Sequence, residues 1–381
     1  MSFEEIKAKF LNIVDKEKFL WYNMPNVNTQ LIPQEKTMIR FECDYTEGAH
    51  ENIIKKLVET NFEQTAGYGN DPYTESAKAK IRKACNRPDA DVHFLVGGTQ
   101  ANITVIASIL KHHQGVISAH TGHIQEHETG AIEATGHRII TTGNDDGKLT
   151  AQQIIDIYDS HMNDSIREFY VQPGMVYISH PTENGTMYTK KEIEDIYAAC
   201  KERNIPLFID GARLGYGLMS PKSDMTLEDI ANNSDVFYIG GTKVGALFGE
   251  AVVITNEAVK KDFRYHIKQR GGLLAKGRLL GIQFDVLFED NLYFEVSKHA
   301  ATLALDIKNA FLEKGIPFRY DSDSNQQFPI LTKEQYETIT EKYSVSYNGE
   351  LPDGRVVVRF CTSWATKEED VKALIEDIKA L

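Results

Sequence analysis

Two stretches of the sequence decide the fold: Pro-Leu-Phe-Ile-Asp-Gly-Ala-Arg (206–213) and Val-Phe-Tyr-Ile-Gly-Gly-Thr-Lys-Val-Gly-Ala (236–246). Each contains a short apolar run and then reaches a charged side chain, Asp210 in the first and Lys243 in the second. Such a run is typical of a buried strand in a parallel sheet. Because ligands of these sheets bind beyond the C-terminal strand ends, we expect Asp210 and Lys243 to face one site.

This pair of side chains suits pyridoxal phosphate. A lysine amine can bond covalently to the aldehyde of this cofactor, and a carboxylate can pair with its pyridinium nitrogen. The carboxylate keeps that nitrogen protonated, so the ring can accept electrons from the substrate Cα. A lysine pKa must fall from its reference value of ~10.4 for this chemistry near neutrality, which a desolvated, electropositive pocket achieves. The alternative is two unrelated charges at two strand ends.

Apolar runs and helical stretches alternate through the middle of the chain. The expected strands are 92–96, 115–118, 137–142, 175–179, 206–210, 236–239 and 251–255. The expected helices are 49–60, 99–112, 123–135, 150–162, 189–203 and 226–231. Repeated strand–helix–strand units predict an α/β domain with a mostly parallel sheet and helices on both faces.

The two ends of the chain differ from this alternating middle. We expect a helix over 3–20 and an extended connector over 23–40, then a long helix over about 270–300 that leaves the sheet domain, a strand at 355–361 and a closing helix at 367–379. The expected division is an N-terminal helix and connector (1–45), a large cofactor-binding domain (46–268) and a smaller α+β domain (269–381).

Composition narrows the class of protein. The chain has 381 residues and a formal net charge of −13, with 41% hydrophobic and 25% charged residues. These shares are ordinary for a soluble globular protein, and the length predicts about two or three domains. The acidic balance argues against nucleic acid or an anionic membrane surface as the main partner.

Targeting signals and cysteine spacing favour a cytoplasmic protein. The four cysteines are far apart and show neither CxxC nor metal-ligand spacing, which fits a reduced setting. The first ten residues contain no apolar run typical of a signal peptide. No stretch approaches the ~20 apolar residues that a membrane span requires.

A glycine-containing turn is the candidate phosphate site. Leu-Val-Gly-Gly-Thr-Gln-Ala-Asn (95–102) ends an expected strand and begins an expected helix. Glycine there lets backbone N–H groups approach a phosphate at the helix N-terminus, and the hydroxyl of Thr99 adds a donor beside Gly98. The alternative is a tight strand–helix turn that Thr99 caps.

The histidine-rich stretch 118–128 supports two interpretations. His123, Glu126 and His127 match H-x-x-E-H, an inverted zinc-peptidase pattern, but the sequence indicates no third ligand. A single histidine stacked on a cofactor ring explains His123 better, with His127 packing the helix. We therefore expect no metal.

Two arginines are candidates for anion binding. Arg213 follows Asp210 closely and is expected at the same sheet edge, where it can bond the ring hydroxyl or a carboxylate. Alternation along 355–361 places Arg355, Val357 and Arg359 on one face. A guanidinium fork suits an amino-acid carboxylate, so Arg359 is the candidate, with a solvated strand arginine as the alternative.

Several segments, in this order, resemble the threonine aldolase group of fold-type I pyridoxal phosphate enzymes, within the wider β-eliminating lyase family. The resemblance runs from about residue 41 to the end, and the low-specificity aldolases are most similar. The segments are Asp-Tyr-Thr-Glu-Gly-Ala-His (44–50), Gly-Tyr-Gly-Asn-Asp-Pro (67–72), Gly-Gly-Thr-Gln-Ala-Asn (97–102), His-Glu-Thr-Gly-Ala-Ile-Glu (127–133), Ile-Asp-Gly-Ala-Arg (209–213), Thr-Lys-Val-Gly-Ala (242–246) and Ile-Lys-Gln-Arg-Gly-Gly-Leu-Leu-Ala-Lys-Gly-Arg (267–278).

The resemblance implies roles for residues around the cofactor. Lys243 would carry pyridoxal phosphate and Asp210 would pair with its ring nitrogen. Gly98 and Thr99 would hold the phosphate, and His123 would stack on the ring. The implied fold is the aspartate aminotransferase type, with a large domain and a smaller C-terminal one.

Other implied roles concern the substrate and a second subunit. Arg213 and Arg359 would hold the ring oxygen and the substrate carboxylate. Tyr68 would reach the site from a neighbouring subunit, which implies a homodimer or a homotetramer. Lys268 or Arg270 would add a phosphate contact across that interface.

The chain departs from the family pattern at two places. Well-known threonine aldolases carry a histidine near the β-hydroxyl, in a Glu-Asn-Thr-His-Asn context, whereas this chain reads His-Pro-Thr-Glu-Asn-Gly (180–185) and places Glu183 there. The Ser-Asp-Thr opening of those enzymes becomes Cys43-Asp44-Tyr45. A carboxylate can still act as a base toward a hydroxyl.

The expected activity is cleavage of β-hydroxy-α-amino acids, such as threonine, to glycine and an aldehyde. Lys243, His123, Asp210 and Glu183 are its expected catalytic residues. Three alternatives stay open at this point: a pyridoxal phosphate β-eliminating lyase that releases ammonia and a keto acid, a zinc peptidase, and a non-catalytic binding protein. A non-catalytic binding protein would not need all of Lys243, Asp210, His123 and Arg359, so the presence of all four argues against it.

Overall fold

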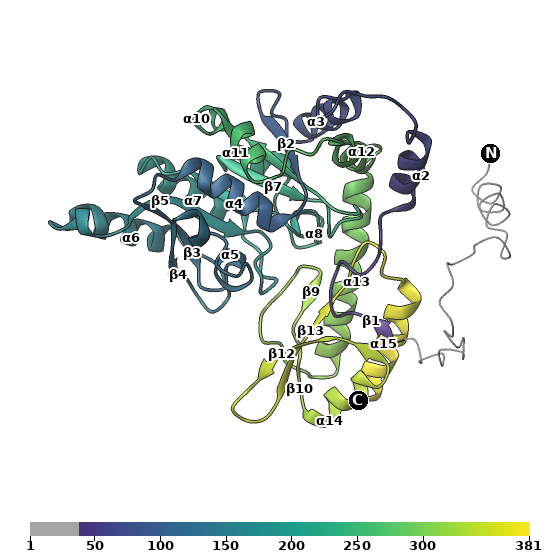
Figure 1. Cartoon of the computed structure of the whole chain (residues 1–381). Coiled ribbons are helices and arrows are strands. Elements are labelled where there is room, and N and C mark those ends of the chain that lie inside the picture. The colour runs from purple at the N-terminus through teal and green to yellow at the C-terminus, as the bar shows by residue number, and fades with distance from the viewer. Residues whose placement is uncertain (1–37) are drawn as a thin grey trace, which may run out of the picture. The chain divides into compact units, whose positions relative to one another are not determined.

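The structure of the protein is a computed structural model that describes residues 38–381. A seven-stranded sheet organises most of them (Figure 1), and hydrogen bonding gives the strand order β2-β8-β7-β6-β5-β3-β4. The strands are β2 Asp91–Leu95, β3 Gln114–Ala119, β4 Arg138–Thr142, β5 Gln172–Ser179, β6 Leu207–Asp210, β7 Val236–Gly240 and β8 Glu250–Ile254.

The sheet is mostly parallel, as predicted. Neighbouring strands from β4 to β7 pair in parallel, and β8 pairs antiparallel with both β7 and β2. The exception has a simple cause, because the chain returns from β7 to β8 through the short segment 241–249 without a crossover helix. The α/β fold class is therefore confirmed.

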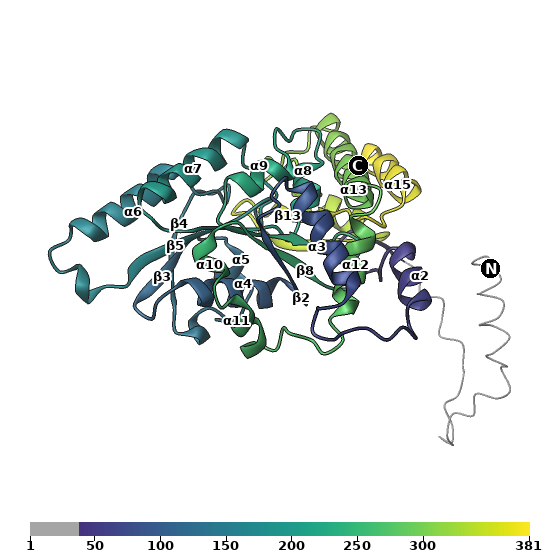
Figure 2. The same ribbon diagram turned by 90° about the horizontal axis from the view of Figure 1, so that it is seen from above.

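Helices cover both faces of the sheet (Figure 2). One face carries α4 (Gly98–Ile109) and α11 (Phe263–Gln269), and the opposite face carries α6 (Ala151–Asn163) and α7 (Lys190–Glu202). The strands supply apolar side chains to both sides, which explains their continuous apolar runs.

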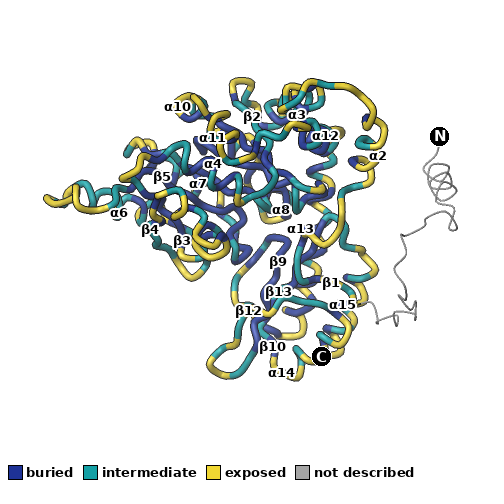
Figure 3. Tube along the Cα trace, in the orientation of Figure 1, coloured by how far each residue is buried: buried dark blue, intermediate teal, exposed yellow. Residues whose placement is uncertain are grey.

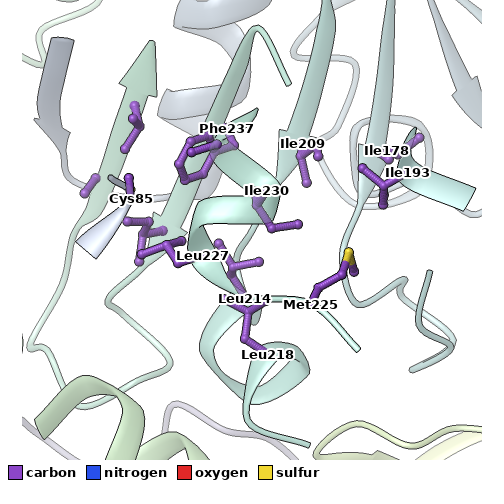
Figure 4. Close-up of a cluster of buried hydrophobic side chains, with 14 of the residues drawn as sticks. Cys85, Ile178, Ile193, Ile209, Leu214, Leu218, Met225, Leu227, Ile230 and Phe237 are labelled. Atoms are coloured by element: carbon purple, nitrogen blue, oxygen red, sulfur yellow. The ribbon is translucent and has the colours of Figure 1, made fainter. Parts of the chain in front are cut away.

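Strand β6 shows how the two cores are filled. Leu207 and Ile209 join the core with α7, while Phe208, which points the other way, joins the core with α4. The first core continues through Phe237, Leu227 and other side chains between the sheet and the helices (Figure 4). Buried residues follow the strands throughout this region (Figure 3).

Two consecutive helices connect the large sheet to a smaller one. They are α12 (Arg278–Leu287) and α13 (Leu292–Glu313). The strands of the smaller sheet are β10 (Ile330–Leu331), β13 (Val356–Cys361) and β12 (Ser346–Glu350), with β9 (Gln326–Gln327) also paired to β13. Helix α15 (Glu368–Ala380) packs against α13 and closes the chain.

The predicted helix over 123–135 is wrong. The structure has one short helix, α5 (His123–Glu126), and a 3₁₀ turn at Glu133–Thr135. Between them Thr129 and Gly130 adopt positive φ angles of 53° and 72°, which a continuous helix cannot contain. The break turns the chain so that Glu128 points inward.

The predicted helix over 270–300 is also wrong as one element. Asp290 and Asn291 have φ angles of 47° and 63°, so the chain ends α12 and starts α13 in a new direction. Asparagine and aspartate tolerate this left-handed conformation better than most residues. The Asp-Asn pair could therefore have indicated the break, but the apolar periodicity on both sides of it favoured one continuous helix.

Other elements agree with the sequence or add to it. The predicted helix at 49–60 is α2 (Glu51–Glu59), while α3 (Pro72–Ala84) and α14 (Lys333–Thr340) were not predicted. The expected helix at 3–20 and most of the connector at 23–40 lie outside the described residues, and the proposed domain boundaries stay a prediction. Among residues 38–381, no helix is long and apolar enough to cross a membrane.

Candidate active site

A cavity of about 900 Å³ lies at the C-terminal ends of the parallel strands. Segments that follow β2, β3, β5, β6 and β7 line it, and the smaller sheet closes another side. The lining residues are Tyr45, Val96, Gly97, Gly98, Thr99, Thr121, His123, Glu126, His127, Glu183, Asn184, Ala212, Arg213, Tyr238, Thr242, Lys243, Glu250, Gln326, Phe328, Ser346, Asn348 and Arg359.

Lys243 presents its amine to this cavity from the turn after β7. The turn is fixed by the N–H groups of Val244 and Ala246, which both donate to the carbonyl of Gly241 at 2.9 and 3.0 Å. Burial lowers the pKa of the Lys243 amine, and the guanidinium of Arg213 lowers it further. A neutral amine is a nucleophile, so the site favours attack on a carbonyl group.

Asp210 ends β6 beneath the cavity and is 4% exposed. Its Oδ2 accepts hydrogen bonds from the Tyr177 hydroxyl at 2.6 Å and from Asn102 Nδ2 at 3.1 Å. Its Oδ1 accepts from the Tyr238 hydroxyl and from the N–H of Ala212 at 3.0 Å. These four donors fix the orientation of the carboxylate.

The turn between β2 and α4 has the predicted form. Helix α4 begins at Gly98 after Gly97, whose lack of a side chain leaves the first turn of N–H groups uncapped. A Cβ on Gly98 would come within 3.0 Å of the Tyr238 hydroxyl, so glycine lets the backbone approach this group. Gly98 and the exposed Thr99 both line the cavity, as an anion site requires.

His123 and Glu183 lie together on the side of the cavity that follows β3 and β5. Glu183 Oε1 accepts from the backbone N–H of His123 at 2.9 Å and from Ser179 Oγ at 2.6 Å. Burial raises the pKa of Glu183, and the charge of Asp210 adds to that effect. The carboxyl therefore holds a proton closer to neutral pH than an exposed glutamate does.

A buried carboxylate orients the ring of His123. Its Nδ1 lies 2.8 Å from Oε1 of Glu128, whose side chain is fully buried. Burial lowers the pKa of His123, but the hydrogen bond to Glu128 and the charge of Asp210 outweigh it, so the pKa is raised. The Nδ1–Glu128 bond leaves Nε2 of the ring for other partners.

Arg213 is engaged by a partner that the sequence did not indicate. Its Nε and Nη2 donate to Oδ2 and Oδ1 of Asp44 at 2.7 and 2.9 Å. Asn325 Nδ2 donates to the same carboxylate at 2.9 Å. The Arg213 guanidinium holds the pKa of the fully buried Asp44 at about 2, against the opposing effect of burial. Arg213 also lines the cavity.

Arg359 reaches the cavity from β13. Its Nη2 donates to the carbonyl of Glu42 at 2.9 Å, and its Nη1 makes a long 3.4 Å contact with Gln326 Oε1. Its Nε is buried and has no hydrogen-bond partner among residues 38–381. A buried donor without a partner is costly, so this guanidinium suits an incoming carboxylate.

Several residues of the site were not identified from the sequence. Tyr177 and Tyr238 read as ordinary apolar strand residues, and Asn102 and Glu128 as helix residues. Glu250 begins β8 and lines the cavity, where burial raises its pKa to about 8. A charged residue at the start of a buried apolar strand was the available signal for it.

Known proteins with similar sequences identify the family of this chain. The family model described as beta-eliminating lyase matches residues 42–317 of the chain. The chain belongs to the beta-eliminating lyase family. Among curated relatives, a low specificity L-threonine aldolase from Pseudomonas sp. (strain NCIMB 10558) is 29% identical over 352 residues, which cover 90% of this chain and 97% of that relative.

Solved structures give the same result for this beta-eliminating lyase family member. Leishmania major threonine aldolase is 46% identical and superposes with a TM-score of 0.87, covering 90% of this chain and 99% of that one. Aspartate aminotransferase from Thermus thermophilus, at 13% identity and a TM-score of 0.64, shares the fold. The predicted family and fold type I architecture are confirmed.

Residues expected at a subunit interface lie outside the cavity of this family member. Tyr68 has a φ angle of 58° and is 45% exposed. The amine of Lys268 lies 5.0 Å from the centre of its ring, and Arg270 Nη1 donates to Gln269 Oε1 at 3.0 Å. Their contribution to a neighbouring subunit's site stays a prediction.

The zinc alternative finds no ligand set in the described chain. The ring centres of His123 and His127 are 5.5 Å apart, but His123 Nδ1 is taken by Glu128. Among residues 38–381, no group of three histidine, cysteine, aspartate or glutamate side chains is arranged to hold a metal ion. His127 also follows the end of α5, so the pattern does not lie on one helix face.

Proposed function

We propose that this protein is a pyridoxal phosphate-dependent aldolase that cleaves β-hydroxy-α-amino acids of the threonine type to glycine and an aldehyde. One observation carries the proposal: Lys243, Asp210 and Arg359 line or border one cavity. The threonine aldolase names of its relatives, including one at 46% identity, support the same substrate class.

The residues present fit the cofactor. The uncapped first turn of α4, with Gly98 and Thr99, offers N–H and hydroxyl donors to a phosphate. The Lys243 amine lines the cavity and has a lowered pKa, which suits a covalent bond to an aldehyde. Asp210, held by its donors, would pair with the ring nitrogen. When bound, the cofactor supplies a ring that stabilises negative charge at the substrate Cα.

Arg359 would bind the substrate carboxylate. Its Nε has no partner among residues 38–381 and its Nη1 makes only the long contact with Gln326, so N–H donors stay available to an incoming carboxylate. This contact would hold the amino acid in one orientation in the cavity. Asp44 holds Arg213 in place, and the Arg213 guanidinium lowers the pKa of the Lys243 amine.

The β-hydroxyl proton would pass to Glu183 or to His123. Both line the cavity, and the hydrogen bond from the His123 N–H to Glu183 keeps them adjacent. A carboxylate with a raised pKa is a stronger base than an exposed one. As the hydroxyl loses its proton, the C–C bond breaks, the aldehyde leaves, and protonation at Cα gives glycine.

A product assay tests this proposal against β-elimination. Purified protein is incubated with threonine and excess pyridoxal phosphate, and glycine, aldehyde, ammonia and keto acid are measured together. Equal amounts of glycine and aldehyde are expected. Ammonia and keto acid in their place would identify the elimination chemistry, and Lys243→Ala with full turnover would refute the proposed role of the lysine.

The substrate size, the partners, the compartment and the oligomeric state are also part of the proposal. We propose that the substrate is a small amino acid, that neither nucleic acid nor membrane is a partner, and that the protein is cytoplasmic. We also propose a homodimer or homotetramer in which Tyr68 enters the neighbouring site. Light scattering would measure the oligomer, and mixing inactive Tyr68→Ala and Lys243→Ala subunits would restore partial activity if sites are shared.

A further inference from the structure

A chain of close polar contacts joins the substrate side of the cavity to the carboxylate beneath it. Glu183 Oε1 lies 2.6 Å from Ser179 Oγ, which lies 3.3 Å from the Tyr177 hydroxyl. That hydroxyl donates to Asp210 Oδ2 at 2.6 Å. Ser179 is 8% exposed and Tyr177 is fully buried.

The sheet geometry fixes this arrangement. Tyr177 and Ser179 are alternate residues of β5, so their side chains leave the same face of the sheet. Ser179 lies directly opposite Asp210 in the parallel pairing of β5 with β6. Glu183 returns over Ser179 in the turn after β5. The contacts therefore join rigid strand positions rather than mobile side chains.

While Glu183 is ionised, the hydroxyl protons are too few for all of these contacts to be made at once. The Ser179 hydroxyl has one proton but two neighbouring acceptors, Glu183 Oε1 and the Tyr177 oxygen. When Glu183 is ionised, the proton goes to the carboxylate, because a charged acceptor makes the stronger bond. When Glu183 is protonated, it can donate to Ser179 Oγ, and the Ser179 hydroxyl can turn to Tyr177.

We propose that Ser179 is a two-position hydrogen-bond switch that couples the protonation of Glu183, through Tyr177, to the hydrogen bonding of Asp210. Ser179 and Tyr177 are thus positioning residues. The meaning of the coupling for catalysis rests on the proposed function, in which Glu183 would accept the β-hydroxyl proton and Asp210 would hold the ring nitrogen of the cofactor. The switch itself depends only on residues of this chain.

Other charges face Glu183 and contribute to its titration. His123 in α5 lowers the pKa of Glu183, whereas burial and Asp210 raise it. Tyr177 and Tyr188 also lie close enough for its charge to raise their pKa values. Glu126 and His127 line the same cavity. Apart from Tyr177, which is itself a test position, these groups stay in place in the variants below, so a shift between variants reports the hydroxyl that was removed.

Two variants should move the titration of Glu183 in opposite directions. Ser179→Ala removes a donor to the ionised carboxylate, so the midpoint should rise by about one pH unit. Tyr177→Phe removes the acceptor that Ser179 needs when Glu183 is protonated, so the midpoint should fall. The midpoint is read from the protonated-carboxyl band in infrared difference spectra of the full chain without substrate, assigned as the band that Glu183→Gln abolishes.

Tyr238→Phe is the matched control. Its hydroxyl also donates to Asp210, but it does not contact Ser179, so the Glu183 midpoint should stay at the wild-type value. Ser118→Ala is the serine control, since that buried hydroxyl lies on β3, the strand beside β5, and donates to the carbonyl of the next residue, Ala119. A Tyr177→Phe midpoint that is unmoved, or that rises with Ser179→Ala, would overturn the coupling.

The acid limb of the kcat/KM profile for threonine supplies an independent readout. It should shift in the same two directions if Glu183 is the base. Opposite infrared shifts without threonine cleavage by the wild-type protein would sustain the switch and refute the proposed function. Threonine cleavage with identical infrared midpoints in all variants would refute the switch alone.

Discussion

Arg359 has donors that its protein partners do not fully use. Its Nη2 is held by the Glu42 carbonyl, but Nε has no partner among residues 38–381. Carboxylate binding would resolve that deficit. We expect Arg359→Lys to lower kcat/KM for threonine by about 10- to 100-fold, because an ammonium group keeps the charge but loses the fork, at a cost of about 1.5–3 kcal/mol.

That loss should appear mainly as a raised KM, measured by steady-state kinetics. The matched control is Arg355→Lys, on the same segment but paired with the exposed Asp353. Unchanged kinetics in Arg359→Lys, or an equal loss in Arg355→Lys, would show that Arg359 does not bind the substrate.

The buried side chain of His180 should make the stability of the protein depend on pH. It is 1% exposed, neither ring nitrogen has a partner among residues 38–381, and burial lowers its pKa to about 4. The folded pKa lies below the unfolded value of ~6.5, so the stabilisation is complete above pH ~6.5 and is lost as the pH falls toward 4. The maximum effect is about 3 kcal/mol.

Urea unfolding at a series of pH values measures this effect. The glutamine in His180→Gln stays neutral at every pH. Between pH ~6.5 and ~4 its unfolding free energy should therefore fall less steeply than that of the wild type, by the slope that uptake of about one proton on unfolding produces. Parallel curves for the two proteins would show that His180 does not titrate on unfolding.

For the helices and strands, the sequence predicted those features that follow from the periodicity of its apolar residues. The apolar runs of β6 and β7 located the sheet, and the structure places Lys243 on the cavity lining and Asp210 beneath it, bonded to the lining residues Ala212 and Tyr238. The breaks at 129–130 and 290–291 were missed, because they depend on single left-handed residues within apolar patterns. Asp44 could not be predicted as the partner of Arg213, since residues so distant in sequence meet only through tertiary packing.

The break after α5 gives a prediction about an element. Gly130 has a φ angle of 72°, which a residue with a side chain adopts at a cost of about 1–2 kcal/mol. We expect Gly130→Ala to lower the free energy of unfolding by that amount and to weaken the His123–Glu128 contact. Gly48→Ala is the control, because Gly48 is exposed and its nearest neighbour is 3.9 Å from the added Cβ. Equal effects from the two changes would contradict this account.

At the scale of the whole described chain, the Asp44–Arg213 pair joins segments distant in sequence. Asn325 adds a third contact to the same carboxylate. Asp44→Asn would leave a buried guanidinium without its counter-charge, so we expect a loss of about 3–5 kcal/mol in unfolding free energy. Asp353→Asn, which breaks the exposed pair with Arg355, should cost less than about 1 kcal/mol. Denaturant unfolding measures the loss in both variants. Similar losses would show that burial of the Asp44–Arg213 pair does not increase its contribution to stability.

The central claim is that Lys243 holds the cofactor covalently opposite Asp210. The most direct measurement is borohydride reduction of the purified protein, followed by proteolysis and mass spectrometry of the labelled peptide. We predict a single pyridoxyl group on the peptide that contains Lys243, and none after reduction of Lys243→Ala. A label on another lysine, or an active protein that carries no label, would contradict the account.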